Sequence, residues 1–392
     1  MKGHIQKRGK QSYRLKFDIG KDANGNRLFD FVTVRGTRKD AEAELAKRLH
    51  EVNIGSYVEN TKLTVTEFLD KRTTTYAEGN VAVKTLEGYK STIENHFKPA
   101  FGSLPLQKLG PFQIQSYYSK AMKDGGRKDG RKGGVSSLTV NHMHRLLSEA
   151  LDMAVRWQLL ARNPCDAVTP PKVDPREVKA IDETAAAWLI EAAQGTRLHL
   201  PIFLATCAGL RRGEILGAVW SNIDEHLGTL RIDCALSETK EEGVFFKKPK
   251  GKRTRTVALP PLLVEALNAH RREQEKNRET LGAAYQDNDL ICCRPDGSLW
   301  PPSAFTSSYR ALLKRRGLDG PNFHALRHSH ASQSLADGVD IKTVSSRLGH
   351  SKASFTLAQY CHLMPGQDQE AAARTDTRMR KALEQVRQPK VV

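Results

Sequence analysis

Four segments in the second half of the chain carry basic side chains, and the last of them adds a tyrosine. They read, in order, AGLRRGEIL, PKGKRTRTVALP, FHALRHSHAS and LGHSKASFTLAQYCH. Cleavage of a phosphodiester without a metal ion needs Arg, Lys and His side chains to stabilise the charge that develops on the phosphate. It also needs a nucleophile, and a tyrosine hydroxyl can serve as one. Together, these residue types favour metal-free chemistry on a phosphodiester.

The first segment places an arginine where a helix is expected to begin. An apolar helix breaks at Gly209, and the next helix begins at Leu210 or Arg211. Backbone N–H groups at a helix start favour an anion, which would help Arg211 to hold a phosphate. Glu214 follows one turn later and is placed to orient the guanidinium. The simpler interpretation is a surface arginine at a helical elbow.

The second segment places Lys250 in a turn before a strand that contains Val257. A lysine in a flexible hairpin can enter a groove, and its ammonium can protonate a leaving oxygen if its pKa is lowered. Lysine runs of this kind are more often solvated or general DNA-binding loops. Lys247, Lys248 and Lys252 are alternatives to Lys250 for the same role.

In the third segment, His324 and Arg327 lie three residues apart on a predicted helix, so they share one face and can reach one phosphate. In the fourth, Gly349 ends a helix, His350 follows, and Tyr360 stands on the next short helix. Because a tyrosine has a pKa near 10, about one in a thousand is ionised at pH 7, and a cationic pocket would ease its ionisation. Without the other motifs, Tyr360 would be interpreted as a partly buried aromatic residue rather than as a nucleophile.

The order arginine, hairpin lysine, His-x-x-Arg, Gly-His and tyrosine resembles the signature of the tyrosine recombinases, the phage-integrase family. Each motif is weak alone, but four motifs in this order form a specific combination. The resemblance covers residues 180–363. It extends to residues 62–165, which are similar to the helical core-binding domain of the family, and to residues 1–57, which resemble its small arm-binding domain.

The resemblance implies a role for each basic side chain. Arg211 and Arg327 would clamp the non-bridging oxygens of the scissile phosphate, and Lys250 would be the general acid toward the 5′-oxygen. His324 and His350 would hydrogen-bond the phosphate and manage the proton of the nucleophile.

The same resemblance implies that Tyr360 attacks the phosphate and becomes a 3′-phosphotyrosine. The phosphotyrosine conserves the bond energy, so the reaction would need no metal, no ATP and no other cofactor. The implied activity is that of a site-specific DNA recombinase, the integrase of a phage or other mobile element, which works through a Holliday junction.

The pattern of apolar residues predicts the elements that would position these groups. The expected fold is multidomain: a small α+β arm domain (1–57), an all-α core-binding domain (62–168) and a mixed α/β, mainly helical catalytic domain with a tail helix (178–392). In the last domain we expect helices at 183–194, 198–208, 211–218, 261–279, 302–316, 324–336, 341–348, 354–362 and 367–387, and strands at 229–235, 243–247 and 253–259.

Residue patterns in the first half predict several element ends. Thr37 and Thr64 are expected to cap helices, with Glu67 completing a capping box after Thr64. A further helix should begin at Thr85 and stop near Pro99. Two more helices should begin, one at Pro111 and one at Ser136 or Ser137, and two strands around Tyr13–Ile19 and 28–34 should precede the first helix.

The composition agrees with a polyanionic partner. The chain has 392 residues and a formal net charge of +18, which favours nucleic acid first and an acidic membrane surface second. No apolar run approaches the roughly 20 residues of a membrane span, and the first residues lack the apolar core of a secretory signal. The six scattered cysteines predict neither disulfides nor a zinc site, which fits a reducing cytoplasm.

Two other functions stay open at this point: a type IB topoisomerase, which shares the tyrosine chemistry, and a non-catalytic DNA-binding regulator. For the leading hypothesis, the expected partners are double-stranded DNA, with core and arm attachment sites, and three further copies of the chain in a homotetramer on DNA. A directionality factor or a host DNA-bending protein would be an additional partner. The expected location is the bacterial cytoplasm at the nucleoid, without membrane association.

Overall fold

The computed structural model describes residues 3–22, 24–55, 57–123, 127, 133–173, 181–249, 254–318, 321–350, 352–360 and 367–387. The chain divides into two compact units, Met1–Pro175 and Arg176–Val392, and each is described by itself. Helices dominate and the sheets are small, as the sequence predicts. Within the described residues, no helix combines the length and the apolar character needed to cross a lipid bilayer.

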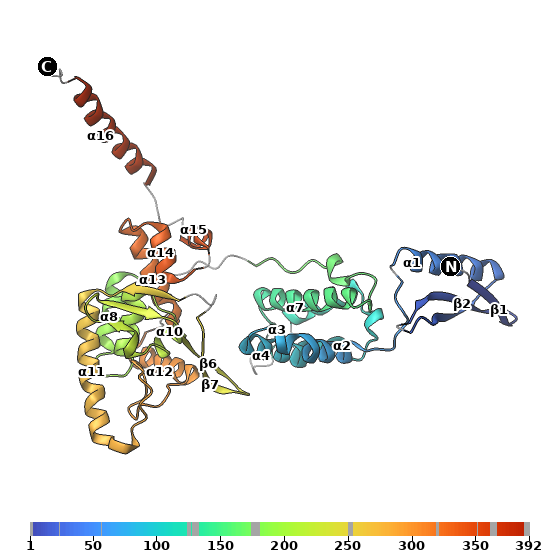
Figure 1. The fold of residues 1–392 in the computed structure, drawn as a ribbon, viewed down its shortest axis with the longest axis horizontal. Coiled ribbons are helices and arrows are strands. Elements are labelled where there is room, and N and C mark those ends of the chain that lie inside the picture. Colours follow the sequence, from blue (N-terminus) through green and yellow to red (C-terminus); the bar gives the residue numbers. More distant parts are fainter. Residues whose placement is uncertain are drawn as a thin grey trace. The chain divides into compact units, whose positions relative to one another are not determined.

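The first unit begins with a three-stranded antiparallel sheet in the order β1-β2-β3, formed by Gly3–Gly9, Ser12–Lys21 and Arg27–Arg35. Helix α1 (Arg38–Asn53), capped by Thr37 as predicted, covers one face of it (Figure 1). Leu15 and Phe17 of β2 are buried on that face. Strand β1 was not among the expected elements, because its sequence GHIQKRG has no alternation of apolar and polar residues.

The rest of the first unit is helical. Its helices are α2 (Val65–Arg72), α3 (Glu78–Asn80), α4 (Val83–Thr92), α5 (Lys98–Phe101), α6 (Pro111–Lys123) and α7 (Ser137–Arg156), with π-helical turns at Thr73–Ala77 and Ile93–Phe97. The predicted caps Thr64 and Ser136 are confirmed. One expectation was wrong: α4 begins at Val83 rather than Thr85. The helical segment continues through the second π-helical turn into α5 and ends at Phe101, so the predicted stop near Pro99 is confirmed to within two residues.

The second unit alternates helices with short antiparallel strands. They are α8 (Glu183–Ala192), α9 (His199–Ala208), α10 (Arg212–Leu216), β4 (Ile223–Asp224), β5 (Thr229–Ile232), β6 (Ala235–Thr239), β7 (Gly243–Lys247), β8 (Arg255–Ala258), α11 (Pro261–Leu281), α12 (Pro302–Arg315), α13 (Phe323–Ala336), α14 (Ile341–Leu348), α15 (Ala353–Tyr360) and α16 (Gln367–Arg387). The expected strand at 229–235 is in fact two strands, β5 and β6, that belong to different sheets.

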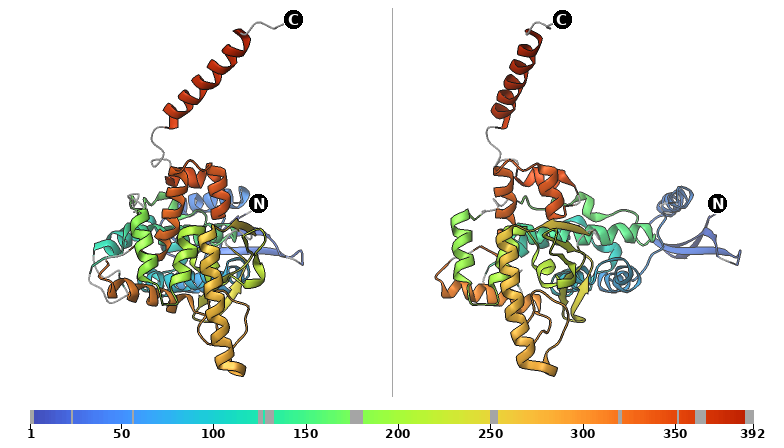
Figure 2. Two further views of the ribbon diagram at one scale, coloured as in Figure 1. Left: turned by 90° about the vertical axis from the view of Figure 1, so that its left-hand side faces the viewer. Right: turned by 60° about the vertical axis from the view of Figure 1, so that its left-hand side comes forward.

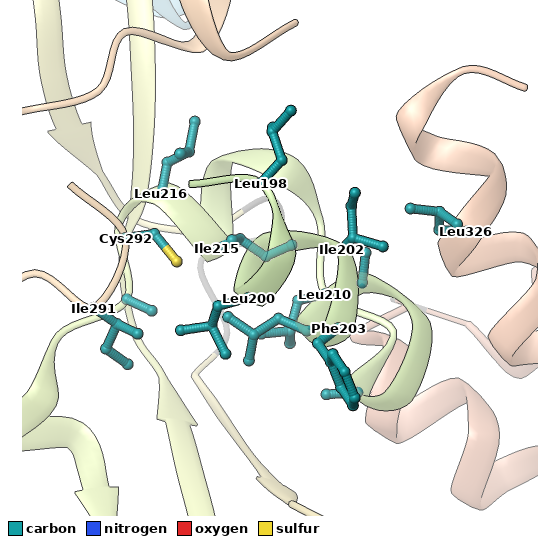
Figure 3. Packing of buried hydrophobic residues seen from close by; sticks show 14 of the residues in the cluster. Leu198, Leu200, Ile202, Phe203, Leu210, Ile215, Leu216, Ile291, Cys292 and Leu326 are labelled. Carbon is teal, nitrogen blue, oxygen red and sulfur yellow. The ribbon is translucent and has the colours of Figure 1, made fainter. Parts of the chain in front are cut away.

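One apolar cluster fixes α9, α10 and α13, and a second joins α13, α14 and α15. In the first, Leu210, Ile215 and Leu216 hold α10 in place, and Leu326 points from α13 toward Ile202 of α9 (Figure 3). Because these side chains are almost completely buried, their neighbours in sequence are held in place as well.

Two helices of the second unit are exposed over much of their length. The C-terminal half of α11 extends beyond the neighbouring elements (Figure 2), and its buried residues Leu263 and Leu267 lie in the N-terminal half. Every side chain of α16 that the structure describes is exposed, including Met379 and Leu383. The predicted helix at 367–387 is thus confirmed, with a modest apolar stripe in contact with solvent.

Candidate active site

Arg211 lies at the junction between two helices. Gly209 ends α9 with a left-handed backbone (φ 66°), and Arg211 occupies the cap position of α10, as predicted. The carboxylate of Glu214 accepts hydrogen bonds from the Arg211 backbone N–H (2.9 Å) and from its guanidinium (2.8 Å). Glu214 thus orients Arg211 as the sequence suggests, and the arginine side chain keeps 23% of its surface exposed.

Glu214 also binds a second arginine, which the sequence analysis did not single out. Arg255, at the start of β8, donates to both carboxylate oxygens of Glu214 at 3.0 and 2.8 Å. Burial by itself would raise the pKa of Glu214, but the hydrogen bonds and charges of Arg255 and then Arg211 outweigh it and lower the pKa to about 2. The glutamate is therefore ionised at neutral pH, and it holds two guanidinium groups side by side.

Arg327 is buried between the ends of two helices. Its Nη1 donates to the carbonyl of Gly209 at the end of α9, and its Nη2 donates to the carbonyl of Leu348 at the end of α14, both at 2.5 Å. Carbonyls at a helix C-terminus have no partner within the helix and carry a partial negative charge, so they suit a cation. Only 3% of Arg327 is exposed.

Three consecutive carbonyls at the end of α14 accept hydrogen bonds from three different arginines. Arg347 accepts from Arg255 Nε at 2.7 Å, Leu348 accepts from Arg327, and Gly349 accepts from Arg211 Nη2 at 3.3 Å. We refer to these carbonyls, of residues 347–349, as the α14 carbonyl cluster. It brings arginines from three distant sequence positions to one place.

A glycine is required in this cluster for two reasons. Gly349 has a left-handed backbone (φ 64°), which side chains rarely adopt. A Cβ atom there would lie 2.9 Å from Nη1 of Arg255. The predicted helix end at Gly349 is thus confirmed, and it is also the site of a close approach.

His350 follows directly and has both ring nitrogens engaged. Nδ1 lies 2.7 Å from the hydroxyl of Thr356, and Nε2 lies 3.2 Å from Nη2 of Arg327. Burial, followed by the charges of Arg327 and Arg211, lowers the pKa of His350 to about 4. Since an arginine can only donate, Nε2 is the acceptor and the neutral ring carries its proton on Nδ1.

His324 lies on the first turn of α13, three residues before Arg327, as predicted. His324 is exposed, whereas Arg327 is buried. Its ring packs edge-on against His328, with the centroids 4.7 Å apart. Desolvation, and then the charges of His328, Arg327 and Arg211, lower the pKa of His324. The exposed position leaves its ring accessible to a bound phosphate.

Tyr360 is the last residue of α15 and is 3% exposed. Its hydroxyl lies 2.5 Å from Nδ1 of His328. Burial raises the pKa of Tyr360 to about 12, although the charge of Arg327 acts in the opposite direction. His328 was not among the residues predicted for the site. It stands four residues after His324 on the same helix face, and this spacing was the available signal.

The structure therefore gathers Arg211, Arg327 and His350 at the end of α14, while His328 connects Tyr360 to the same helix that carries Arg327. Lys250 falls in residues 250–253, outside the described residues. The cysteine Cys361 also lies outside them, and the five described cysteines form no disulfide.

Two family models match parts of this chain. The phage integrase family model matches residues 172–366, and the model of the phage integrase N-terminal SAM-like domain matches residues 64–122. The chain belongs to the phage integrase family. The first matched range contains every catalytic residue that the sequence suggested, and the second lies in the helical part of the first unit.

Two curated relatives of this integrase-family chain match over most of its length. A tyrosine recombinase XerC-like protein of Caldanaerobacter subterraneus subsp. tengcongensis is 29% identical, covering 94% of this chain and 97% of the relative. The ICEBs1 integrase of Bacillus subtilis is also 29% identical, covering 74% of this chain and 77% of the relative.

Solved structures confirm the fold class. The Tn1549 transposon integrase in complex with a circular intermediate DNA superposes with a TM-score of 0.65 at 17% identity, covering 80% of this chain and 99% of that one. A lambda integrase tetramer bound to a Holliday junction superposes with a TM-score of 0.54 at 18% identity, covering 89% and 96%. At these identities, the likeness establishes the fold.

Proposed function

We propose that the chain is a site-specific DNA recombinase, the integrase of a phage or another mobile element. It cuts and rejoins DNA through a 3′-phosphotyrosine intermediate and a Holliday junction. The observation that supports this most is the convergence of Arg211, Arg327 and His350 on the end of α14, with the Tyr360 hydroxyl tied to the helix of Arg327. Family membership is consistent with the same activity.

In the proposed reaction, Arg211 and Arg327 hold the non-bridging oxygens of the scissile phosphate, and His324 and His350 hydrogen-bond to it. Tyr360 attacks phosphorus, the bond to the 5′-oxygen breaks, and Lys250 gives that oxygen a proton. Fixed cations stabilise the charge of the transition state without having to reorganise, so the reaction uses no metal, ATP or other cofactor.

The first sheet has a face suited to arm-type DNA sites. On the face opposite α1, Lys16 pairs with Phe31 across the β2–β3 ladder, and its ammonium lies 4.1 Å from the Phe29 ring centroid. The Arg14 guanidinium lies 4.4 Å from the Phe31 ring centroid. Cations held on exposed aromatic rings provide phosphate contacts on a rigid surface, which supports the arm-domain assignment of residues 1–57.

The active assembly that we propose is a homotetramer on two paired core sites, formed in the bacterial cytoplasm at the nucleoid. The exposed apolar stripe of α16 is consistent with a segment that packs on another surface once DNA is bound. A directionality factor or a host DNA-bending protein would act on the same complex. The division into domains at residues 1–57, 62–168 and 178–392 stays a prediction.

A suicide substrate that traps the covalent adduct tests the function. Wild-type protein should form a protein–DNA band on a nicked core site, and Tyr360→Phe should not, because phenylalanine removes only the nucleophilic oxygen. Both proteins should shift the core DNA to a similar extent in a binding gel, which is the control for folding. A covalent band that persists in Tyr360→Phe would exclude Tyr360 as the nucleophile.

A further inference from the structure

The hydroxyl of the proposed nucleophile has a histidine partner outside the set that the sequence suggested. Nδ1 of His328, on α13, lies 2.5 Å from the hydroxyl of Tyr360, on α15. The two residues are 32 positions apart in the sequence. His328 is half-buried and Tyr360 is buried. At 2.5 Å, the oxygen and the nitrogen are within hydrogen-bond distance, so a proton can pass between them without movement of either side chain.

The charged and titratable groups around His328 determine its protonation state. Among the described residues, its titratable neighbours are His324 and Arg327 on its own helix, His350 after α14, and Tyr360 at the end of α15. Burial, and then the charge of Arg327, lowers the pKa of His328. The ring is therefore neutral at pH 7, and Nδ1 can accept the hydrogen bond from the tyrosine.

The two other histidines of the site are placed less well to accept that proton. His350 uses Nε2 to accept from Arg327 and Nδ1 to bond with Thr356. Where the chain is described, no hydrogen bond joins the ring of His324 to the hydroxyl, and this ring packs against His328 instead. Both can serve the phosphate while a third histidine serves the tyrosine.

We propose that His328 is a further catalytic residue, the general base that removes the proton from Tyr360 as it attacks. The O–H bond of Tyr360 breaks and its proton passes to Nδ1 of His328, while the tyrosine oxygen forms a bond to phosphorus. The bond from phosphorus to the 5′-oxygen breaks, and that oxygen takes a separate proton from the general acid. In the rejoining step, His328 returns its proton to the tyrosine oxygen. This role rests on the proposed recombinase function.

The His328→Asn variant tests the role with little change in shape. An asparagine amide takes the place of Nδ1 and can still hydrogen-bond to the hydroxyl, but it cannot accept a proton at neutral pH. Single-turnover cleavage of a core site should fall by about 100- to 10,000-fold, the usual contribution of a general base. Binding to the core DNA should remain close to that of the wild type.

A substrate with a 5′-bridging sulfur separates the base from the acid. A thiolate leaves without a proton, so this substrate should rescue Lys250→Ala, whose missing group is the proposed acid. It should not rescue His328→Asn, because the tyrosine must still lose its proton. Equal cleavage of the sulfur substrate by His328→Asn and wild-type protein would overturn the proposal.

The pH dependence of cleavage, compared between His328→Asn and a control variant at a second histidine, completes the test. Wild-type cleavage of the sulfur substrate should decline at low pH as His328 becomes protonated, and His328→Asn should lack this limb and instead accelerate toward alkaline pH. His330, two residues later, donates from Nδ1 to the Thr206 carbonyl, and His330→Asn should keep the wild-type profile.

One result would contradict the recombinase function, and a different result would contradict the role of His328 as general base. If wild-type protein forms no covalent adduct, the recombinase function itself is wrong. If the adduct forms and His328→Asn produces it at the wild-type rate or faster, His328 only holds the tyrosine in place. Restoration of His328→Ala by added imidazole would support a proton-transfer role.

Discussion

Two arginines, one in each unit, are almost completely buried, and their partners differ. Arg72, at the end of α2, is 0% exposed and donates from Nη2 to Glu149 at 2.6 Å, while its Nε and Nη1 have no hydrogen-bond partner in the described part of the chain. Arg327 is 3% exposed and forms an ion pair with no carboxylate among the described residues. It donates instead to the carbonyls of Gly209 and Leu348.

The difference separates a structural arginine from one that we place in catalysis. Burial of a cation carries a desolvation penalty, and Arg72 offsets it with a carboxylate, so the pair has no net charge. Helix-end carbonyls offset the same penalty for Arg327 through dipoles alone, so its net charge remains available to a phosphate. The two buried arginines therefore leave different net charges: none at the Arg72–Glu149 pair, and one positive charge at Arg327.

Removal of the charge of Glu214, the buried carboxylate of the second unit, should have the largest effect on stability. Glu214→Gln leaves Arg211 and Arg255 side by side without a counter-charge, so we expect the free energy of unfolding at pH 7 to fall by about 3–5 kcal/mol. Urea titration followed by tryptophan fluorescence measures it, since three of the four tryptophans lie in this unit. Glu225→Gln is the control, because the Glu225–Arg271 pair is exposed on both sides and should contribute little.

The same variant should change the dependence of stability on pH. The pKa of Glu214 in the folded protein, about 2, lies below its usual value of about 4.3. Its ionised form therefore stabilises the fold above pH 4.3, and this stabilisation is lost as the pH falls toward 2. Wild-type protein should lose stability across this window more steeply than Glu214→Gln. Parallel curves for the two proteins would contradict the buried ion-pair assignment.

Arg327→Gln should have the next largest effect, and on catalysis. Glutamine can donate to one helix-end carbonyl but carries no charge, so single-turnover cleavage should slow by about 100- to 1,000-fold. Arg327→Lys should not restore it, because a single ammonium cannot span Gly209 and Leu348 as the two guanidinium nitrogens do. Near-normal cleavage by either variant would remove Arg327 from the set of phosphate ligands.

Arg72→Met should have the smallest effect. Methionine fills a similar volume without two unpartnered donors, and Glu149, whose side chain is 44% exposed, can be solvated. Because the carboxylate left behind reaches solvent, the variant leaves no buried charge without a partner, so we expect a change within about 1 kcal/mol and unaltered cleavage of the core site. A cleavage defect in a folded Arg72→Met protein would show that this arginine also serves function.

Helix starts and ends that depend on one side chain and its neighbours in sequence were predictable from the sequence. Thr37, Thr64 and Ser136 cap their helices because their hydroxyls reach a backbone N–H three residues ahead. Gly349 ends α14 because the left-handed backbone there suits glycine. That His324 and Arg327 share one face of a helix was also predictable, because it follows from the period of an α-helix alone.

Features that depend on packing between distant segments were not predictable. The contact of His328 with Tyr360 requires α13 and α15 to meet, and no local pattern encodes that. The role of Arg255 likewise depends on β8 lying beside both Glu214 and α14.

The α14 carbonyl cluster has a consequence for how this chain tolerates sequence change. Three guanidinium groups are aligned by main-chain oxygens, and every amino acid supplies such an oxygen. Most of α14 can therefore diverge without moving the arginines, provided that the helix forms and ends at Gly349. A saturation library across residues 341–349 should show wide tolerance at the exposed helix positions and a sharp restriction at the glycine. The alignment of the charges thus depends on the shape of the backbone rather than on the side chains of α14.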